Sequence, residues 1–133
     1  MKILLDSSVL IDVLRNRKAR REILAQLTRA GHTLATSSLN MAEVYAGMRR
    51  NEKIRTDDLF DNLQCFDLTA ASGKRGGTLK QQWAERGRTL TLDDMMIAAV
   101  AIDNDCTLMT DNRKDFPMSE LKLYPLETSR DTC

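Results

Sequence analysis

The stretch Lys2–Leu14, read as KILLDSSVLIDVL, constrains the fold more than any other part of the chain. It contains three consecutive apolar residues, Ile3 to Leu5, and this run stops at Asp6. An apolar run without alternation predicts a central parallel strand that is covered on both faces. Apolar residues then recur at helical spacing, and either serine of Ser7–Ser8 is a favoured helix N-cap. We therefore expect a buried strand followed at once by a helix, with a carboxylate at the junction.

Asp6 has two interpretations at this junction. In open α/β sheets, ligands bind at the carboxyl ends of the strands, and Asp6 falls at such an end. Aspartate is also a favoured helix cap, and from this stretch alone capping explains Asp6 equally well. A functional role requires further carboxylates that converge on the same strand end.

Length and composition place the chain among globular proteins. We expect a single domain over residues 1–133, which is long enough to bury a sizeable core. The balance of 29% charged and 42% hydrophobic residues excludes a disordered chain. No apolar run approaches the roughly 20 residues that span a bilayer, and the N-terminal apolar run is too short for a signal peptide. We therefore expect a cytoplasmic protein that does not enter a membrane.

The cysteines and the histidine exclude several kinds of site. Cys65, Cys106 and Cys133 are odd in number and far apart, which fits neither a disulfide framework nor a zinc site, and we expect the first two to be core thiols. His32 is the only histidine and has no nucleophile motif near it, which argues against a histidine-based triad. Phosphate-binding glycine loops and a Gly-x-Ser-x-Gly elbow do not occur in the sequence.

Basic residues gather in two clusters, although the net charge is only +1. The first cluster follows the first predicted helix and the second lies near the middle of the chain: Arg15, Arg17, Lys18, Arg20 and Arg21, then Arg49, Arg50, Lys53 and Arg55. A run of charges usually marks a solvated face, so neither cluster by itself indicates nucleic-acid binding.

Strand and helix patterns alternate along the rest of the chain. Short strands are predicted at 33–36, 65–68, 106–109 and 121–126, and helices at 19–30, 40–50, 51–62, 69–85 and 92–102. Glycines near its beginning predict an irregular start for the helix at 69–85. We expect Trp83 in the core and Thr91 as the cap of the last helix. The alternation predicts an α/β fold, a three-layer α/β/α sandwich with a mainly parallel central sheet.

Further acidic residues fall at strand ends or helix starts. Glu43 lies in the first turn of the helix at 40–50, Asp94 at the third position of the last helix, and Asp111 directly after a strand. Taken by itself, Glu43 is explained more simply as a complement to the helix dipole. In one parallel sheet, however, these acids and Asp6 can share the carboxyl edge, and carboxylates brought together need a neutralising cation. Mg²⁺ prefers oxygen ligands, and such a site can activate a water for attack on phosphorus.

Four segments of the chain together resemble a known family. ILLDSSVLIDVL, SSLNMAEVYAGM, LDDMMIAAVAI and LMTDNRKDF look like the four motif blocks of PIN-domain proteins, most of all the VapC toxins of bacterial toxin–antitoxin pairs. The likeness covers nearly the whole chain, in the expected order and spacing. It implies the same α/β/α sandwich and an endoribonuclease, dependent on Mg²⁺ or Mn²⁺, that hydrolyses RNA phosphodiester bonds with a metal-activated water.

The resemblance also assigns roles to individual residues. The family acids fall on Asp6, Glu43 and Asp94. The resemblance implies that these three are catalytic residues and metal ligands, and that Glu43 acts through water. Asp93 is expected to face solvent or to cap the helix. A supporting shell is implied around them: Ser8, Thr110, Asn112 and Asp115. The fourth family acid is an asparagine in this sequence, and an amide binds Mg²⁺ more weakly than a carboxylate, so the neighbouring Asp111 or Asp115 is an alternative for that position.

Partners follow from the same resemblance. It implies an RNA substrate, with transfer RNA as a candidate, and a cognate VapB-type antitoxin. It further implies a homodimer within a larger toxin–antitoxin complex, which would reach DNA only through the antitoxin. Two other functions on the same scaffold stay open at this point: a DNA- or flap-type nuclease, and a non-catalytic PIN-like binding module.

Overall fold

Five parallel strands form the centre of the molecule in a computed structural model, which describes residues 1–126. The strand order is β3-β2-β1-β4-β5, and every neighbouring pair is parallel. The strands are β1 (Lys2–Leu5), β2 (Thr33–Ser37), β3 (Gln64–Phe66), β4 (Cys106–Met109) and β5 (Lys122–Leu123). The apolar run that opens the sequence is therefore the central strand, as predicted.

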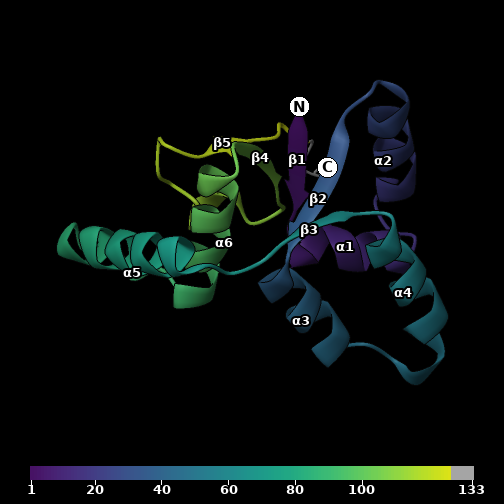
Figure 1. Cartoon of the computed structure of the whole chain (residues 1–133), viewed down its shortest axis with the longest axis horizontal. Helices are drawn as coiled ribbons and strands as arrows, with labels where there is room; N and C mark the ends of the chain where they lie inside the picture. Colours follow the sequence, from purple (N-terminus) through teal and green to yellow (C-terminus); the bar gives the residue numbers. More distant parts are fainter. Residues whose placement is uncertain (127–133) are drawn as a thin grey trace.

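Helices cover both faces of this sheet (Figure 1). One layer contains α1 (Ser7–Leu14), α2 (Arg20–Arg29), α3 (Ser38–Ala46) and α4 (Lys53–Asp61), and the other contains α5 (Ala70–Glu85) and α6 (Leu92–Asp103). Short 3₁₀ helices, η1 (Arg50–Glu52) and η2 (Arg113–Asp115), lie in the connections. The predicted α/β/α sandwich is confirmed.

The pleat of β1 explains why its apolar run is continuous. Ile3 and Leu5 pack into the core beneath α1 to α4, whereas Leu4 packs into the separate core beneath α5 and α6. All three side chains are fully buried. Burying one such side chain contributes about 1.5–3 kcal/mol, so both faces of this strand need apolar residues. The run ends where the strand leaves the two cores.

Helix caps agree with the sequence at α6, decide between the predicted candidates at α1 and differ from the expectation at α5. Thr91 caps α6, as predicted, by accepting a hydrogen bond from the backbone of Asp94. The cap of α1 is Asp6 and neither serine that follows it. The start of α5 is regular and not irregular, because Thr69 and Ser72 form a capping box that satisfies its first turn.

Two expectations about buried residues were wrong. Cys65 is exposed because β3 is an edge strand, while Cys106 is buried as expected; Cys133 lies outside the described residues. Trp83 is only partly buried, and the guanidinium groups of Arg86 and Arg88 lie over its ring. Among residues 1–126, no helix has the length and apolar character needed to cross a membrane.

Candidate active site

The parallel pairing of β1 with both β2 and β4 brings three strand ends together. Asp6 follows β1, Ser37 ends β2, and Thr110 follows β4. The backbone N–H of Asp6 donates to the carbonyl of Met109 at 3.0 Å, which fixes the ends of β1 and β4 side by side. Side chains from segments more than 100 residues apart in the sequence therefore meet at this carboxyl edge.

Asp6 is 5% exposed, and three hydrogen bonds hold its carboxylate. The backbone N–H of Ser7 and the side-chain amide of Asn40 donate to Oδ1 at 2.9 and 3.1 Å, and the hydroxyl of Thr110 donates to Oδ2 at 2.6 Å. The first of these bonds makes Asp6 the cap of α1. Asp6 thus combines the two features that the sequence indicated, a helix cap and a carboxylate at a strand end.

The environment of Asp6 disfavours its negative charge. Burial raises the pKa of Asp6 above its ordinary value of 3.8, while hydrogen bonds from Thr110, Ser7 and Asn40 oppose the rise and the charge of Asp111 adds to it. A cation bound beside this carboxylate would lower the pKa again, because opposite charge favours the ionised form.

Glu43 lies in the second turn of α3 and not in the first turn as predicted, because the helix already begins at Ser38, and it connects to Asp6 through two polar side chains. The hydroxyl of Ser7 donates to Glu43 Oε1 at 2.6 Å. The amide of Asn40 donates to the Ser7 hydroxyl at 3.0 Å as well as to Asp6. The two acids are therefore held in a fixed relation by a continuous hydrogen-bonded chain.

Asp94 stands in the first turn of α6, where the hydroxyl of Thr91 caps the helix. Burial raises the pKa of Asp94, and the charges of Asp6, Asp115 and Glu43 raise it further, against the hydrogen bond from Thr91. Water screens charges less in a partly buried site, so these three carboxylates act on Asp94 across the space between them. The neighbouring Asp93 is exposed, as predicted.

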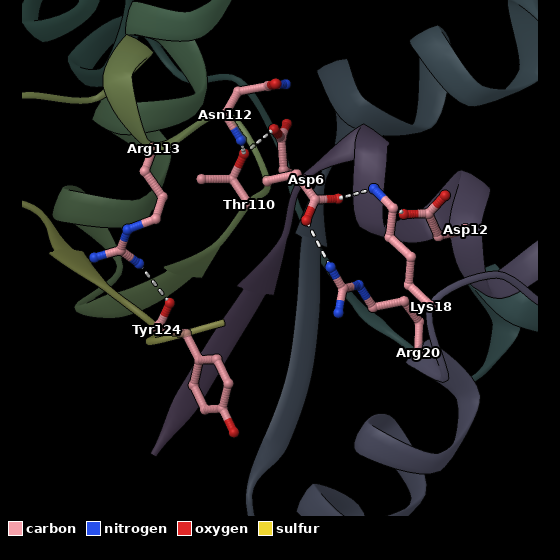
Figure 2. A network of polar contacts seen from close by, with 9 residues as sticks. Asp6, Asp12, Lys18, Arg20, Thr110, Asn112, Arg113 and Tyr124 are labelled. Carbon is pink, nitrogen blue, oxygen red and sulfur yellow. Dashed lines mark hydrogen bonds and ion pairs between the residues drawn. The ribbon is translucent and has the colours of Figure 1, made fainter. Parts of the chain in front are cut away.

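The loop after β4 supports Asp6, because Thr110 and Asn112 of this loop lie beside it (Figure 2). The Thr110 hydroxyl, which donates to Asp6, accepts from the backbone N–H of Asn112 at 3.0 Å. Asp111 pairs with Arg20 at 2.6 Å and with Lys18 at 3.5 Å. Two cations of the first basic cluster therefore neutralise Asp111, whereas the Asn112 residue is exposed.

Two further polar residues belong to this site and were not among the predicted site residues. Asn40 is fully buried and contacts Asp6, and Ser7 contacts Glu43, whereas the hydroxyl of Ser8 is buried without a hydrogen-bond partner in the described structure. The sequence does carry a signal for Asn40, because it precedes Glu43 by three residues and so shares its helix face. No comparable signal distinguishes Ser7 from Ser8.

Direct ligation of one ion by three acids is not preformed at this edge. Within residues 1–126, no group of three or more His, Cys, Asp or Glu side chains is close enough together to hold a metal ion. The site therefore consists of two linked acids, Asp6 and Glu43, and of Asp94, whose pKa is raised by their charges and by that of Asp115.

Comparisons with known proteins agree with this architecture. The PIN domain model matches residues 3–118. Ribonuclease VapC19 from Mycobacterium tuberculosis is 32% identical, with 86% of this chain and 92% of the relative covered. Ribonuclease VapC10 from the same species is 34% identical, with 89% of this chain and 88% of the relative covered.

Solved structures show the same fold. VapBC2 from Rickettsia felis, bound to a DNA fragment from the promoter, superposes with a TM-score of 0.85 at 23% identity and covers 96% of this chain and 100% of that chain. DNA-bound VapBC from Salmonella typhimurium gives a TM-score of 0.81 at 19% identity and covers 93% of this chain and 97% of that chain. On the family match over most of the chain and the identities to VapC relatives, this chain belongs to the PIN-domain family, with the VapC ribonucleases among its relatives.

Proposed function

We propose that the chain is a metal-dependent endoribonuclease, the toxin of a VapBC-type pair, in which Asp6, Glu43 and Asp94 carry the catalysis. The observation that supports this most strongly is the hydrogen-bonded link between two of these acids at the carboxyl edge of the sheet. Asp6, which follows β1, is joined through Asn40 and Ser7 to Glu43 of α3, and Asp94 in the first turn of α6 carries a pKa that their charges raise. Relatives named as VapC ribonucleases favour RNA over DNA as the substrate.

The chemistry of the donor set fits Mg²⁺ or Mn²⁺. All polar side chains around Asp6 offer oxygen or amide groups, and the repulsion among the acids is relieved by a cation. Mg²⁺ is usually bound through one or two carboxylates and retains several waters, so it does not need a preformed three-acid cage. When bound, the ion supplies Lewis acidity and lowers the pKa of a bound water.

The residues of this chain have separable roles in the proposed site. Asp6 is the proposed principal ligand because three hydrogen bonds fix its orientation. Asp94 is the second proposed ligand, and Glu43, held by Ser7, positions the attacking water. Thr110 and the backbone of Asn112 orient Asp6, and the charge of Asp115 raises the pKa of Asp94. Ser8, whose buried hydroxyl is unpartnered among residues 1–126, is a candidate to contact a phosphate oxygen.

The proposed partners rest on the solved relatives. VapBC structures from Rickettsia felis and Haemophilus influenzae, which by name pair VapB with VapC, support a VapB-type antitoxin for this chain. DNA-bound complexes support contact with DNA through the antitoxin. A homodimer and a transfer RNA target remain part of the proposal.

A matched pair of variants tests the proposed function. Asp94→Asn should lose at least 100-fold in RNA cleavage with Mg²⁺, a loss expected when charge that acts on the transition state is removed. Asp93→Asn, next to it but exposed, should cleave at the parent rate. Both proteins are assayed on RNA and on single-stranded DNA, and EDTA should stop cleavage.

Each alternative predicts a different result. Faster cleavage of DNA than of RNA would favour the DNA-nuclease alternative. Equal cleavage by Asp94→Asn and the parent would contradict the assigned site. Neither cleavage nor calorimetric binding of Mg²⁺ or Mn²⁺ would favour a binding module.

A further inference from the structure

The two basic clusters of the sequence meet in space. A cavity of about 470 Å³ lies between the turn that follows α1 and the segment containing η1 and the start of α4. Five arginines and a single acid line most of it: Arg15, Arg17, Arg21, Arg49, Arg55 and Glu52. Residues that are about 30 positions apart in the sequence thus form one strongly positive groove.

Part of this groove is rigidly constructed. Arg15 pairs with the buried Glu52 at 3.3 Å, and the guanidinium of Arg21 donates to the carbonyls of Val13 and Leu14 at 2.8 and 3.1 Å, at the end of α1. The backbone N–H of Arg49 donates to the same glutamate at 2.8 Å. These bonds fix the floor of the groove and join its two sides.

Within the described part of the chain, no ion pair neutralises the remaining positive charge of the groove. Among residues 1–126, Glu52 is the only carboxylate in the lining, and it pairs with Arg15. Arg17, Arg49 and Arg55 form no ion pair within residues 1–126 and are exposed. Guanidinium groups bind phosphate oxygens in a bidentate geometry, so the groove favours a phosphate-rich ligand.

The position of the groove relative to Asp6 suggests which ligand this is. Asp6 caps the beginning of α1 and Arg15 caps its end, and nine residue steps at a rise of 1.5 Å give a separation of about 13.5 Å. At an axial spacing of roughly 3.4 Å per nucleotide of a stacked strand, about four nucleotides span this distance. A polynucleotide at the acidic edge is repelled by the carboxylates there and needs compensating positive charge nearby.

From this arrangement we propose that the groove binds backbone phosphates of the RNA substrate, about four nucleotides from the bond at the acidic edge. This inference rests on the proposed ribonuclease function and names the part of the protein that holds the substrate. Because the contacts are to phosphates, they contribute affinity without reading base sequence.

The test compares two double variants in salt titrations. A labelled single-stranded RNA is titrated, in EDTA, with Arg17→Ala/Arg55→Ala and with Arg29→Ala/Lys122→Ala, a charge-matched control at exposed positions outside the groove. The slope of log K against log salt is negative, and loss of two phosphate contacts should reduce its magnitude by about 1.4. Binding at low salt should weaken roughly tenfold. The control should match the parent. An unchanged slope and affinity in the groove variant would overturn the proposal.

Cleavage kinetics separate this proposal from the proposed function. For a long RNA, the groove variant should raise KM and leave kcat unchanged, whereas an RNA too short to reach the groove should be cleaved at the parent kcat/KM. A parent protein that neither binds nor cleaves RNA contradicts the ribonuclease function itself. A parent that cleaves RNA, with groove variants of equal KM, contradicts only the groove. Unchanged RNA binding combined with weaker binding of the antitoxin would assign the groove to a protein partner and so overturn the proposal.

Discussion

The variant Asp6→Asn preserves the shape of the side chain and removes its charge. The amide oxygen can still accept from the backbone of Ser7 and from Asn40, and the new amide N–H₂ points at the Thr110 hydroxyl. That hydroxyl has two lone pairs and accepts only one bond, from Asn112, so it can accept a second. The carbonyl oxygen and the new amide of the variant therefore keep partners, while the Thr110 hydroxyl hydrogen loses its acceptor, and the fold should tolerate the change.

The energetic balance of this substitution can be worked from the contacts. The bonds from Ser7 and Asn40 each lose about 1 kcal/mol when their acceptor is no longer charged, and the bond with Thr110 reverses its direction at a similar cost. Against this loss, the burial cost of an ionised carboxylate, several kcal/mol, disappears. Since the pKa of Asp6 is raised, the burial cost is the larger of the two. We therefore expect Asp6→Asn to abolish RNA cleavage and to increase the free energy of unfolding by about 1 kcal/mol at pH 7.

The pH dependence of this difference follows from the same shift. A raised pKa means that the folded state of the parent binds more protons than the unfolded state between the ordinary value of 3.8 and the raised value. The stability of the parent therefore falls as the pH rises through that window. Below it, Asp6 is protonated in both states, so the advantage of the variant should shrink as the pH is lowered.

Urea unfolding in EDTA at several pH values measures both effects. Asp12→Asn is the control, because Asp12 is equally enclosed but lies 3.5 Å from Lys18, so removing its charge should bring no gain. An Asp6→Asn protein that is less stable than the parent by 1 kcal/mol or more at pH 7 would refute the reasoning. It would mean that hydrogen bonding to the charge outweighs burial.

Two further pairs of variants test the contacts of the site and of the helix layer. Ser7→Ala should reduce RNA cleavage about tenfold and destabilise the folded protein by about 1 kcal/mol, because Glu43 loses its hydroxyl donor. Ser8→Ala removes a buried hydroxyl that has no partner among residues 1–126, so it should not lower the stability of the protein. Cleavage rates and urea unfolding measure both effects. Gly76→Ala should destabilise the folded protein by about 1–3 kcal/mol, since its Cβ would lie 2.6 Å from a methionine sulfur of α6. Gly77→Ala has open space around it and should raise Tm. Equal effects of the two variants in thermal melts would be incompatible with this packing.

Local patterns in the sequence were sufficient to predict much of the fold. A continuous apolar run marks a strand buried on both faces, and Ile3, Leu4 and Leu5 occupy the central strand. Thr91 caps α6 because its hydroxyl and the helix start are neighbours in the chain. Such features depend on interactions within a few residues, which any sequence displays directly.

The candidate site was predicted less completely. Asp6 and Glu43 were identified as acids at the carboxyl edge, but the residue that joins them, Asn40, was not. Its role depends on the distance between α1 and α3, which is set by the packing of both helices on the sheet. The choice of Ser7 over Ser8 as the partner of Glu43 depends equally on the rotation of α1 about its axis.

The sequence by itself determined which elements form and which acids stand at their ends, because strand burial and helix capping act between near neighbours. Only the tertiary structure decided where long side chains point. Asp111 pairs with Arg20 across 91 positions of sequence, and two clusters of arginines, each unremarkable alone, face one another across a cavity. Charges separated along the chain interact only after the backbone has brought them within a few ångström, since water and salt screen them at longer range.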